Sequence, residues 1–533
     1  MTVQQNGGQA LVAALHAHGV DTVFGIPGTH NLSAFAALHE FGVRTVLTRH
    51  EQGAGYAADG YARISGRPGV CLTTSGPAIL NAAAAAAQAW SDSVPVLFVS
   101  PGPPTDHPGL GNGYLHEVRD QRAAMGSIVA YSHRVGSVGE IPLAVTSAFA
   151  AMTGGRPRPV HLEIPLDLLD ATAEVELLAP VEVPVPRPAE AALDAAAQVL
   201  AGARRPVVIA GGGARRAATP LRVLAERLDA PVLTTANGKG VLDEDHPLAV
   251  GAGLHQPSAR RLVEDSDVVL AVGTELAPSD LWNGPFTLTG TLVRIDIDPA
   301  AIITNADPGI RLVGDAAATL DALVDFLPVS GIGRCSDQYH SQDERVAEAR
   351  VALRADAAAE GAPWQEILTA LAPVVGASTV IAGDSTMACY YGVLSGLPVH
   401  RPSGFLYPTG GGTLGYGLPA AIGAMLAEPE ARVLAMLGDG GIMFTLSELA
   451  SAAQLGLGLP VLVVDNGGYG EIRNEMVDRG DPATAVDLSP VDFAALAEAM
   501  GCHGVRITDA ADLTAAITTA LRADRPTVLW IKA

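Results

Sequence analysis

Two stretches of the sequence place an oxygen-bearing side chain after an apolar run. The run 433–437 leads into Asp439, and the run 460–464 leads into Asn466. The glycines around them are Gly438, Gly440, Gly441, Gly468 and Gly470. If the two runs are neighbouring parallel strands, about 4.8 Å apart, the two side chains can share a small hard cation such as Mg²⁺. Glycine lets backbone N–H groups approach a phosphate. The pattern predicts a metal–diphosphate site, although the same residue types also form ordinary turns.

A third candidate is Glu51, which opens the helix-length segment 51–64, rich in alanine and glycine. A carboxylate in the first turn of a helix often serves only to stabilise the helix dipole. In a buried apolar setting, however, the pKa of a carboxyl rises, which suits proton transfer near neutral pH. The residue alone leaves both interpretations open.

The spacing from Gly438-Asp439-Gly440 to Asn466 resembles the cofactor signature of thiamine-diphosphate-dependent 2-oxo acid decarboxylases and acetolactate synthases. The resemblance covers the whole chain and implies three domains: pyrimidine-binding, central and diphosphate-binding. It implies that Asp439, Asn466 and the main-chain carbonyl of Gly468 hold Mg²⁺, which bridges the diphosphate. The cofactor-binding residues expected on this basis are Glu51, Thr74, Gly412, Leu414, Gly438, Asp439, Gly440, Gly441, Asn466, Gly468, Tyr469 and Gly470.

The resemblance also implies roles around the reacting carbon. In segment 49–63, which is similar to the family's glutamate motif, Glu51 bonds to the aminopyrimidine ring, whose imino form takes the proton from the thiazolium C2. In segment 411–421, the carbonyl of Gly412 accepts from the 4′-amino group and Leu414 is the wedge that bends the cofactor. The family's site lies between two subunits, so a homodimer is the smallest active unit expected, and we expect a homotetramer.

Histidines near predicted strand ends are candidates for proton transfer and substrate binding, although lone histidines more often pack or face solvent. We expect His30 and His116 to be catalytic and His107 to contact substrate. Segments 25–30, 111–117, 273–276 and 468–473 resemble 2-ketoarginine decarboxylases. This implies decarboxylation of 5-guanidino-2-oxopentanoate to an aldehyde and CO₂. A guanidinium requires a carboxylate partner, for which Asp280 and Glu471 are the candidates.

Other activities and cofactors fit the residues less well. One alternative is a carboligase of acetolactate-synthase type; another is a non-catalytic nucleotide-binding scaffold, and a nicotinamide oxidoreductase ranks third. The segment 410–415 fits GxGxxG but follows no convincing strand, and 211–216 lacks the third glycine. The segment 276–280 lacks the arginine-rich stretch that contacts flavin in acetolactate synthases, so we expect no FAD.

The chemistry-bearing residues must be positioned by alternating strands and helices. Fully apolar runs alternate with helix-length segments such as 51–64 and 77–90, which is typical of a parallel sheet covered on both faces. A helix is expected over 445–455, with Thr445 and Glu448 as a capping box. The fold class is therefore α/β, with three tandem doubly wound domains at 1–178, 190–330 and 360–533. A proline-rich linker at 180–188 and a polar connector at 327–361 separate them.

Composition excludes several partner classes. The chain has 33 Lys and Arg against 56 Asp and Glu, a net charge of −23, which disfavours nucleic acid and anionic membrane surfaces. The cysteines at 71, 335, 389 and 502 form no CxxC pattern and are expected to be reduced thiols. With no signal peptide or long apolar span, we expect a cytoplasmic enzyme whose small-molecule partner is a 2-oxo acid.

Overall fold

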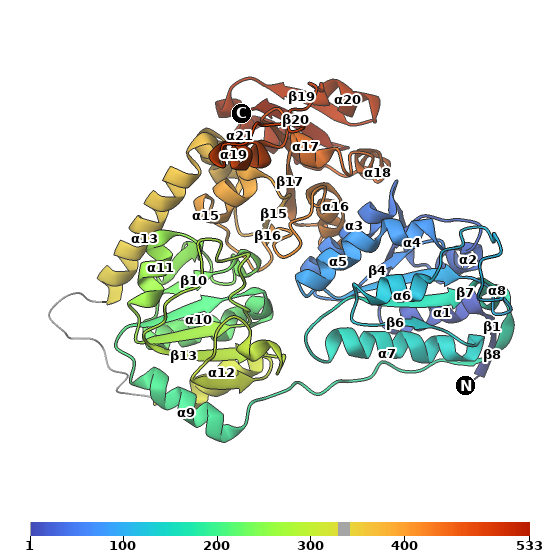
Figure 1. Ribbon diagram of the computed structural model, residues 1–533, viewed down its shortest axis with the longest axis horizontal. Helices are drawn as coiled ribbons and strands as arrows, with labels where there is room; N and C mark the ends of the chain where they lie inside the picture. The colour runs from blue at the N-terminus through green and yellow to red at the C-terminus, as the bar shows by residue number, and fades with distance from the viewer. Residues whose placement is uncertain (1, 329–341) are drawn as a thin grey trace.

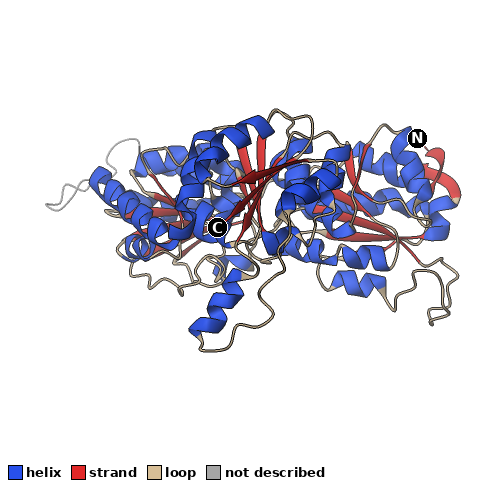
Figure 2. Cartoon of the chain, turned by 90° about the horizontal axis from the view of Figure 1, so that it is seen from above, coloured by secondary structure: helices blue, strands red, loops and turns tan. Residues whose placement is uncertain are grey.

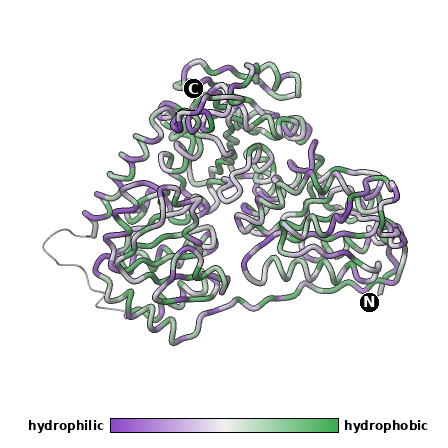
Figure 3. Tube along the Cα trace, in the orientation of Figure 1, coloured by the Kyte–Doolittle hydropathy of each residue, from purple (hydrophilic) through white to green (hydrophobic). Residues whose placement is uncertain are grey.

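The chain folds into three α/β bodies, each built on a six-stranded parallel sheet (Figure 1). The structure is a computed structural model that describes residues 2–328 and 342–533. Helices cover both faces of the sheets (Figure 2), and apolar residues follow the strands through the interior (Figure 3). The expected fold class is confirmed. Within the described residues, no helix combines the length and apolar character needed to cross a lipid bilayer.

The N-terminal sheet has the order β3-β2-β4-β5-β7-β6. Its strands are β2 (Thr22–Gly25), β3 (Arg44–Leu47), β4 (Gly69–Leu72), β5 (Val96–Gly102), β6 (Ser132–Arg134) and β7 (Val160–Pro165). Its helices are α1 (Gly7–Ala17), α2 (Leu32–Glu40), α3 (Glu51–Ser65), α4 (Pro77–Asn81), α5 (Ala83–Ser91), α6 (Gln121–Gly126), α7 (Ile141–Thr153) and α8 (Leu166–Asp170). The single helix expected over 77–90 is divided at Ala82. A short antiparallel pair, β1 (Thr2–Asn6) with β8 (Thr172–Glu176), closes this body.

The C-terminal sheet, β16-β15-β17-β18-β20-β19, repeats the N-terminal strand order. Its strands are β15 (Thr379–Gly383), β16 (Phe405–Leu406), β17 (Arg432–Gly438), β18 (Pro460–Asp465), β19 (His503–Ile507) and β20 (Thr527–Lys532). Its helices include α14 (Gln365–Leu371), α15 (Leu394–Gly396), α16 (Gly417–Ala427), α17 (Asp439–Ile442), α18 (Glu448–Gln454), α19 (Gly470–Asp478), α20 (Phe493–Ala499) and α21 (Leu513–Ala520). In each sheet the chain turns away in opposite directions from a central pair of strands, β2/β4 or β15/β17. Ligands of open α/β sheets bind at such a switch point.

The GxGxxG-like segment 410–415 does not directly follow a strand, because β16 covers only Phe405–Leu406, as the sequence indicated. One sequence-based expectation about the C-terminal body was wrong. The helix expected from Thr445 begins only at Glu448, and no side chain caps it. Thr445 Oγ1 instead donates to the Gly415 carbonyl at 2.7 Å. The capping-box pattern therefore marks contacts between segments rather than a helix start.

The central sheet has the order β11-β10-β9-β12-β13-β14. Its strands are β9 (Pro206–Ala210), β10 (Val232–Thr234), β11 (Ala249–Ala252), β12 (Val268–Val272), β13 (Thr291–Asp296) and β14 (Ile310–Val313). Its helices are α9 (Glu190–Ala201), α10 (Ala218–Leu228), α11 (Pro257–Glu264) and α12 (Ala316–Phe326), and α13 (Gln342–Glu360) leads to the C-terminal body (Figure 1). The predicted connector 327–361 lies partly outside the described residues, as does Cys335. The other three cysteines are free and buried.

The N- and C-terminal bodies meet where α3 packs on α16. The helices come so close that a Cβ on Gly423 would lie 1.9 Å from the Ala57 carbonyl oxygen, and a Cβ on Gly60 would lie 2.2 Å from that of Ala420. Only residues without a side chain fit there. This contact fixes α3, and therefore Glu51 at its start, against the C-terminal body.

A buried polar network joins all three bodies beside this contact. The Arg63 guanidinium donates to Asp59 at 2.6 Å, to Asp92 at 2.8 Å and to Asn237 of the central body at 2.8 Å. Tyr416 of the C-terminal body donates to Asp59 at 2.6 Å. The two carboxylates, in spite of burial, hold the pKa of Arg63 above its usual value. A buried charge is tolerated here because it is fully paired.

Candidate active site

Asp439 and Asn466 meet at the carboxyl ends of neighbouring strands. β17 and β18 pair in parallel, as expected from the sequence. The Asn466 amide lies 3.2 Å from Asp439 Oδ1 and 2.8 Å from the Gly468 carbonyl oxygen. With its nitrogen turned toward them, the amide donates to both; with its oxygen turned toward them, three oxygen atoms converge and require a cation. Gly468 has φ +138°, a backbone conformation that favours glycine. The residues present therefore fit a Mg²⁺ site.

The loop after β15 forms the other wall of this site, and sequence reasoning missed it. A Cβ on Gly441 would lie 2.3 Å from Asp384 Oδ2, and one on Gly438 would lie 2.7 Å from Thr386 Oγ1. The buried Asp384 carboxylate accepts from the backbone of Gly415 and Tyr416 at 3.0 Å each. Burial raises its pKa to about 6. The signal that could have identified this loop is its place after the first strand of the domain, next to the reversal of strand order.

Gly412 and Leu414 lie on the segment that Asp384 holds. Gly412 has φ +58°, and nothing lies within 4 Å of a Cβ built on it. The neighbouring Thr413 hydroxyl is 2.5 Å from Tyr56 Oη of α3. A Cβ on Gly441 would lie 3.9 Å from Leu414 Cδ2. Leu414 therefore lies near the metal-ligand loop, the turn that begins at Asp439, and its neighbour Thr413 contacts α3.

Glu51 is the first residue of α3, and its Oε2 accepts from Asn81 Nδ2 at 3.0 Å. His50 is the N-cap, and its Nδ1 accepts from the Gln52 backbone at 3.1 Å. The helix therefore has a cap of its own, and the Glu51 side chain is not consumed in capping it. That leaves the carboxylate available for a ligand.

His30 and His116 are brought together around a serine beyond the ends of β2 and β4. His30 Nδ1 lies 2.6 Å from Ser75 Oγ, which is 3.3 Å from His116 Nδ1. Burial and the nearby His116 lower the pKa of His30. Thr74 Oγ1, in the same turn, is buried without a hydrogen-bond partner. His30, Ser75 and His116 line a small cavity with Tyr114, so proton-carrying groups face an open space here.

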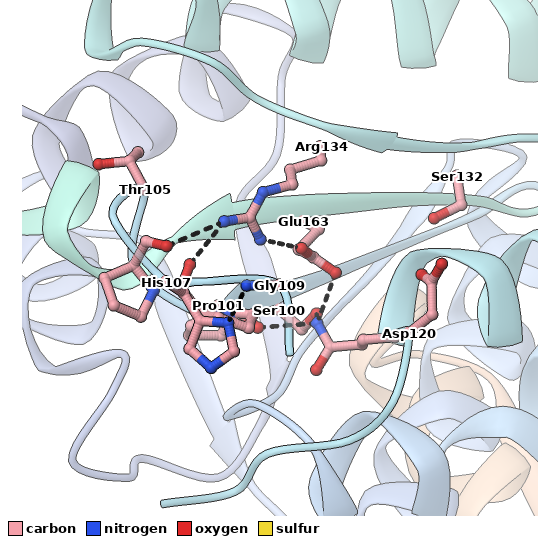
Figure 4. A network of polar contacts seen from close by, with 12 residues as sticks. Ser100, Pro101, Thr105, His107, Gly109, Asp120, Ser132, Arg134 and Glu163 are labelled. Atoms are coloured by element: carbon pink, nitrogen blue, oxygen red, sulfur yellow. Dashed lines mark hydrogen bonds and ion pairs between the residues drawn. The ribbon is translucent and has the colours of Figure 1, made fainter. Parts of the chain in front are cut away.

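A polar network that includes Ser100, Arg134 and Glu163 (Figure 4) extends to the turn that carries Ser75. Gln121 Oε1 accepts from the Gly76 backbone at 2.7 Å, while its Nε2 donates to Ser100 Oγ at 2.9 Å and to Glu163 at 3.1 Å. Glu163 in turn is paired with Arg134. These contacts join the turn after β4 to β5, β6 and β7. Ser75 belongs to this turn and is thereby held in place.

The other substrate candidates fall in different places. His107 lies 3.0 Å from Glu117 Oε1 on the loop before α6 and does not line the His30 cavity. Asp280 lies in the central body and accepts from the Ala236 backbone at 3.1 Å. Burial, with the carboxylates of Asp92 and Glu275, raises its pKa to about 7. Asp280 therefore belongs to the junction between the bodies rather than to the histidine cavity.

Glu471 directly follows Gly470, the glycine that packs against the proposed metal ligand Asn466. A Cβ on Gly470 would lie 2.5 Å from Asn466 Nδ2. Tyr391 Oη donates to Glu471 Oε1 at 2.6 Å, and the rings of Tyr390 and Tyr391 are 4.6 Å apart. Burial and the Glu471 carboxylate together raise the pKa of both tyrosines. Both come from a π-helical turn, Ala388–Val393, a conformation frequent at functional sites.

Family comparisons agree with this architecture. Residues 5–124 match the N-terminal TPP binding domain of thiamine pyrophosphate enzymes, residues 193–323 their central domain, and residues 382–531 their C-terminal TPP binding domain. Together the three matches span most of the chain in the expected order.

Individual relatives cover nearly the whole chain. A probable 2-ketoarginine decarboxylase, AruI, of Pseudomonas aeruginosa is 44% identical over 93% of this chain and 88% of its own length. A probable acetolactate synthase large subunit of Methanocaldococcus jannaschii is 33% identical over 98% and 91%. The acetolactate synthase isozyme 2 large subunit of Escherichia coli is 33% identical over 99% and 95%. The chain therefore belongs to the thiamine pyrophosphate enzyme family.

Proposed function

We propose that this enzyme uses thiamine diphosphate and Mg²⁺ to decarboxylate a 2-oxo acid with a cationic side chain, 5-guanidino-2-oxopentanoate or a close analogue. The observation that carries the proposal is the convergence of Asp439 Oδ1, the Asn466 amide and the Gly468 carbonyl. These oxygen-bearing groups suit a hard divalent ion, and such an ion neutralises a diphosphate.

The bound cofactor would supply the carbon nucleophile and the electron sink that allow CO₂ to leave. Glu51 would exchange a proton with the aminopyrimidine ring, the Gly412 carbonyl would accept from its amino group, and Leu414 would pack against the cofactor. Glu51 of one subunit would serve the diphosphate site of the other, so we propose a homodimer as the smallest active unit and a homotetramer as the complete assembly.

The histidine cavity would handle the protons of the substrate. Burial and the nearby His116 lower the pKa of His30, which favours its neutral form near pH 7. The neutral imidazole can accept a proton as well as donate one. Ser75 Oγ lies within hydrogen-bonding reach of both rings, so a proton could pass between His30 and His116. Thr74 Oγ1, buried without a partner, would bond to bound cofactor or substrate.

Glu471 would bind the guanidinium. The carboxylate is oriented by Tyr391, and the acidic side chains of Glu360 and Glu475 also act on that tyrosine. A carboxylate among aromatic rings and further negative charge favours a planar cation. AruI, the 44% identical relative, is named for a substrate with a guanidinium group, which supports the same choice.

We propose further that the central body works without FAD. The loops after β9 and β12 lie against each other at the reversal of strand order: Gly213 N donates to the Gly273 carbonyl at 3.0 Å. A Cβ on Gly211 would lie 2.3 Å from the same oxygen. This close contact between the two loops supports the proposal, because an α/β domain usually takes a nucleotide at this crevice.

A carboligase of acetolactate-synthase type is the second candidate, favoured by the synthases that match 98% or more of the chain. A panel of 2-oxo acids separates the two. We expect CO₂ and aldehyde in equal amounts from the guanidino acid, only when thiamine diphosphate and Mg²⁺ are both present. Acetolactate from pyruvate would favour the carboligase, and no CO₂ from any acid would overturn both.

A further inference from the structure

Glu448 is a fully buried carboxylate of the C-terminal body whose hydrogen bonds reach into the N-terminal body. Its Oε1 accepts from the backbone N–H groups of Arg49 and His50 at 3.0 Å each. Its Oε2 accepts from Ser451 Oγ at 2.7 Å. The proposed reaction assigns it no role, yet burying a carboxylate is costly unless it is well paired.

The two N–H groups belong to the residues immediately before Glu51. The backbone N–H groups at the start of a helix have no partner within the helix and need an outside acceptor. For α3 that acceptor comes from a different domain, from the first residue of α18. The start of α3 is therefore fixed to the C-terminal body of its own chain, whereas the diphosphate site that Glu51 would serve belongs to the other subunit.

Close packing against Glu448 also fixes the first turn of α3. A Cβ on Gly53 would lie 2.5 Å from Glu448 Oε1, so the carboxylate lies directly against the first turn of α3. A side chain at position 53 would push it away from Arg49 and His50. The hydrogen bonds and this contact act on one turn, whose first residue is Glu51.

We propose that Glu448 is a positioning residue for Glu51: it anchors the Arg49–His50 backbone to the C-terminal body of the same chain and so sets how α3 presents the Glu51 carboxylate to the aminopyrimidine bound at the other subunit's diphosphate site. This inference rests on the proposed role of Glu51. Small displacements matter because proton transfer needs hydrogen-bond distance and alignment, and misplacement by about 1 Å can cost ~100-fold in rate.

The test compares Glu448→Ala and Glu448→Gln with Glu430→Ala, a control at an exposed glutamate. The direct readout is the exchange of the C2 proton of bound thiamine diphosphate for deuterium in the holoenzyme, measured by NMR after acid quench. Glu448→Ala should slow exchange and kcat together by ~10- to 100-fold, with cofactor Kd and substrate KM little changed. Glu448→Gln keeps an oxygen that can accept both N–H bonds and should recover most of the rate.

Gly53→Ala provides a second variant should Glu448→Ala fail to fold. It should slow exchange in the wild-type background, and the double variant should be no slower than Glu448→Ala because both changes break one contact. Wild-type exchange in Glu448→Ala, or equal losses in the Ala and Gln variants, would overturn the inference. If Glu51→Gln also left exchange unchanged, the proposed role of Glu51 would fail instead, so the two failures are distinguishable.

Discussion

The Tyr391 hydroxyl donates to Glu471 Oε1 at 2.6 Å. The two residues come from different segments, the π-helical turn after β15 and the first turn of α19. Because Gly470 packs against Asn466, this pair places an oriented carboxylate next to the proposed metal site. If the substrate is the proposed guanidino acid, this arrangement would bind its cationic end to the same loops that would hold the cofactor.

Replacing Glu471 should therefore affect charged substrates alone. A hydrogen bond to a charged group contributes about 1.5–3 kcal/mol, so Glu471→Gln should raise KM for the guanidino acid about tenfold or more. KM for an uncharged 2-oxo acid of similar length should change little. Asp478→Asn, the same charge change at an exposed site of α19, is the control. Equal effects on both substrates would remove Glu471 from the cation site.

Glu51→Gln should stop turnover without releasing the cofactor. The amide preserves size but cannot exchange a proton as a carboxyl does, and such groups contribute about 10²- to 10⁴-fold. Steady-state kinetics and calorimetric titration with thiamine diphosphate check the two halves of this prediction. Unchanged kcat would contradict the role of Glu51, and a cofactor affinity lost in parallel with kcat would make it a binding residue instead.

Arg63 should be a major source of stability between the three bodies. Arg63→Met keeps the volume but leaves Asp59 and Asp92 buried without their cation, and breaking a buried pair costs about 3–5 kcal/mol. Urea unfolding followed by circular dichroism should show this loss, with Arg522→Met as a surface control. Because the cause is uncompensated charge, Asp59→Asn and Asp92→Asn added to Arg63→Met should restore part of the stability. A change below about 0.5 kcal/mol, usual for surface sites, would refute this account.

His161 should make the protein less stable in mild acid. The ring is buried between Ser100 and Ser132 at 2.8 and 2.7 Å, and burial lowers its pKa from 6.5 to about 3. Between these values the unfolded chain binds a proton that the folded chain refuses, so stability falls as pH drops below 6.5. From pH 7.5 to 5.5 this one group should cost about 1.4 kcal/mol.

The measurement is urea unfolding of cofactor-free protein at both pH values and one protein concentration. The pH-dependent loss should be smaller by about that amount in His161→Gln. His503→Gln, at an exposed histidine, should behave like the wild type. An identical pH dependence in His161→Gln and wild type would show that the ring does not carry the effect.

The sequence predicted the site best where polar residues follow buried parallel strands. Asp439 and Asn466 could be paired because both end buried parallel strands, and parallel strands bring their carboxyl ends to one edge. The alternation of strands and helices predicted the fold class for the same reason. His30 and His116 could be listed as candidates, but nothing local in the sequence shows that Ser75 lies between them.

What escaped prediction depends on contacts between distant segments. Glu448 followed a capping-box pattern, yet its carboxylate bonds to Arg49 and His50 in another domain. Asp384 gave no motif, because its role is to hold the backbone of Gly415 and Tyr416. Tertiary contacts of this kind override local preferences, and spacing within one segment does not reveal them.

The most direct measurement is the affinity of the protein for thiamine diphosphate with Mg²⁺ and with the metal chelated, followed by calorimetry. Wild-type protein should bind tightly with Mg²⁺ and about tenfold or more weakly after chelation. Asp439→Ala should bind weakly under both conditions, and Asp478→Asn should match the wild type. Cofactor binding that ignores the metal in wild-type protein, or full metal-dependent binding in Asp439→Ala, would contradict the site on which this account is built.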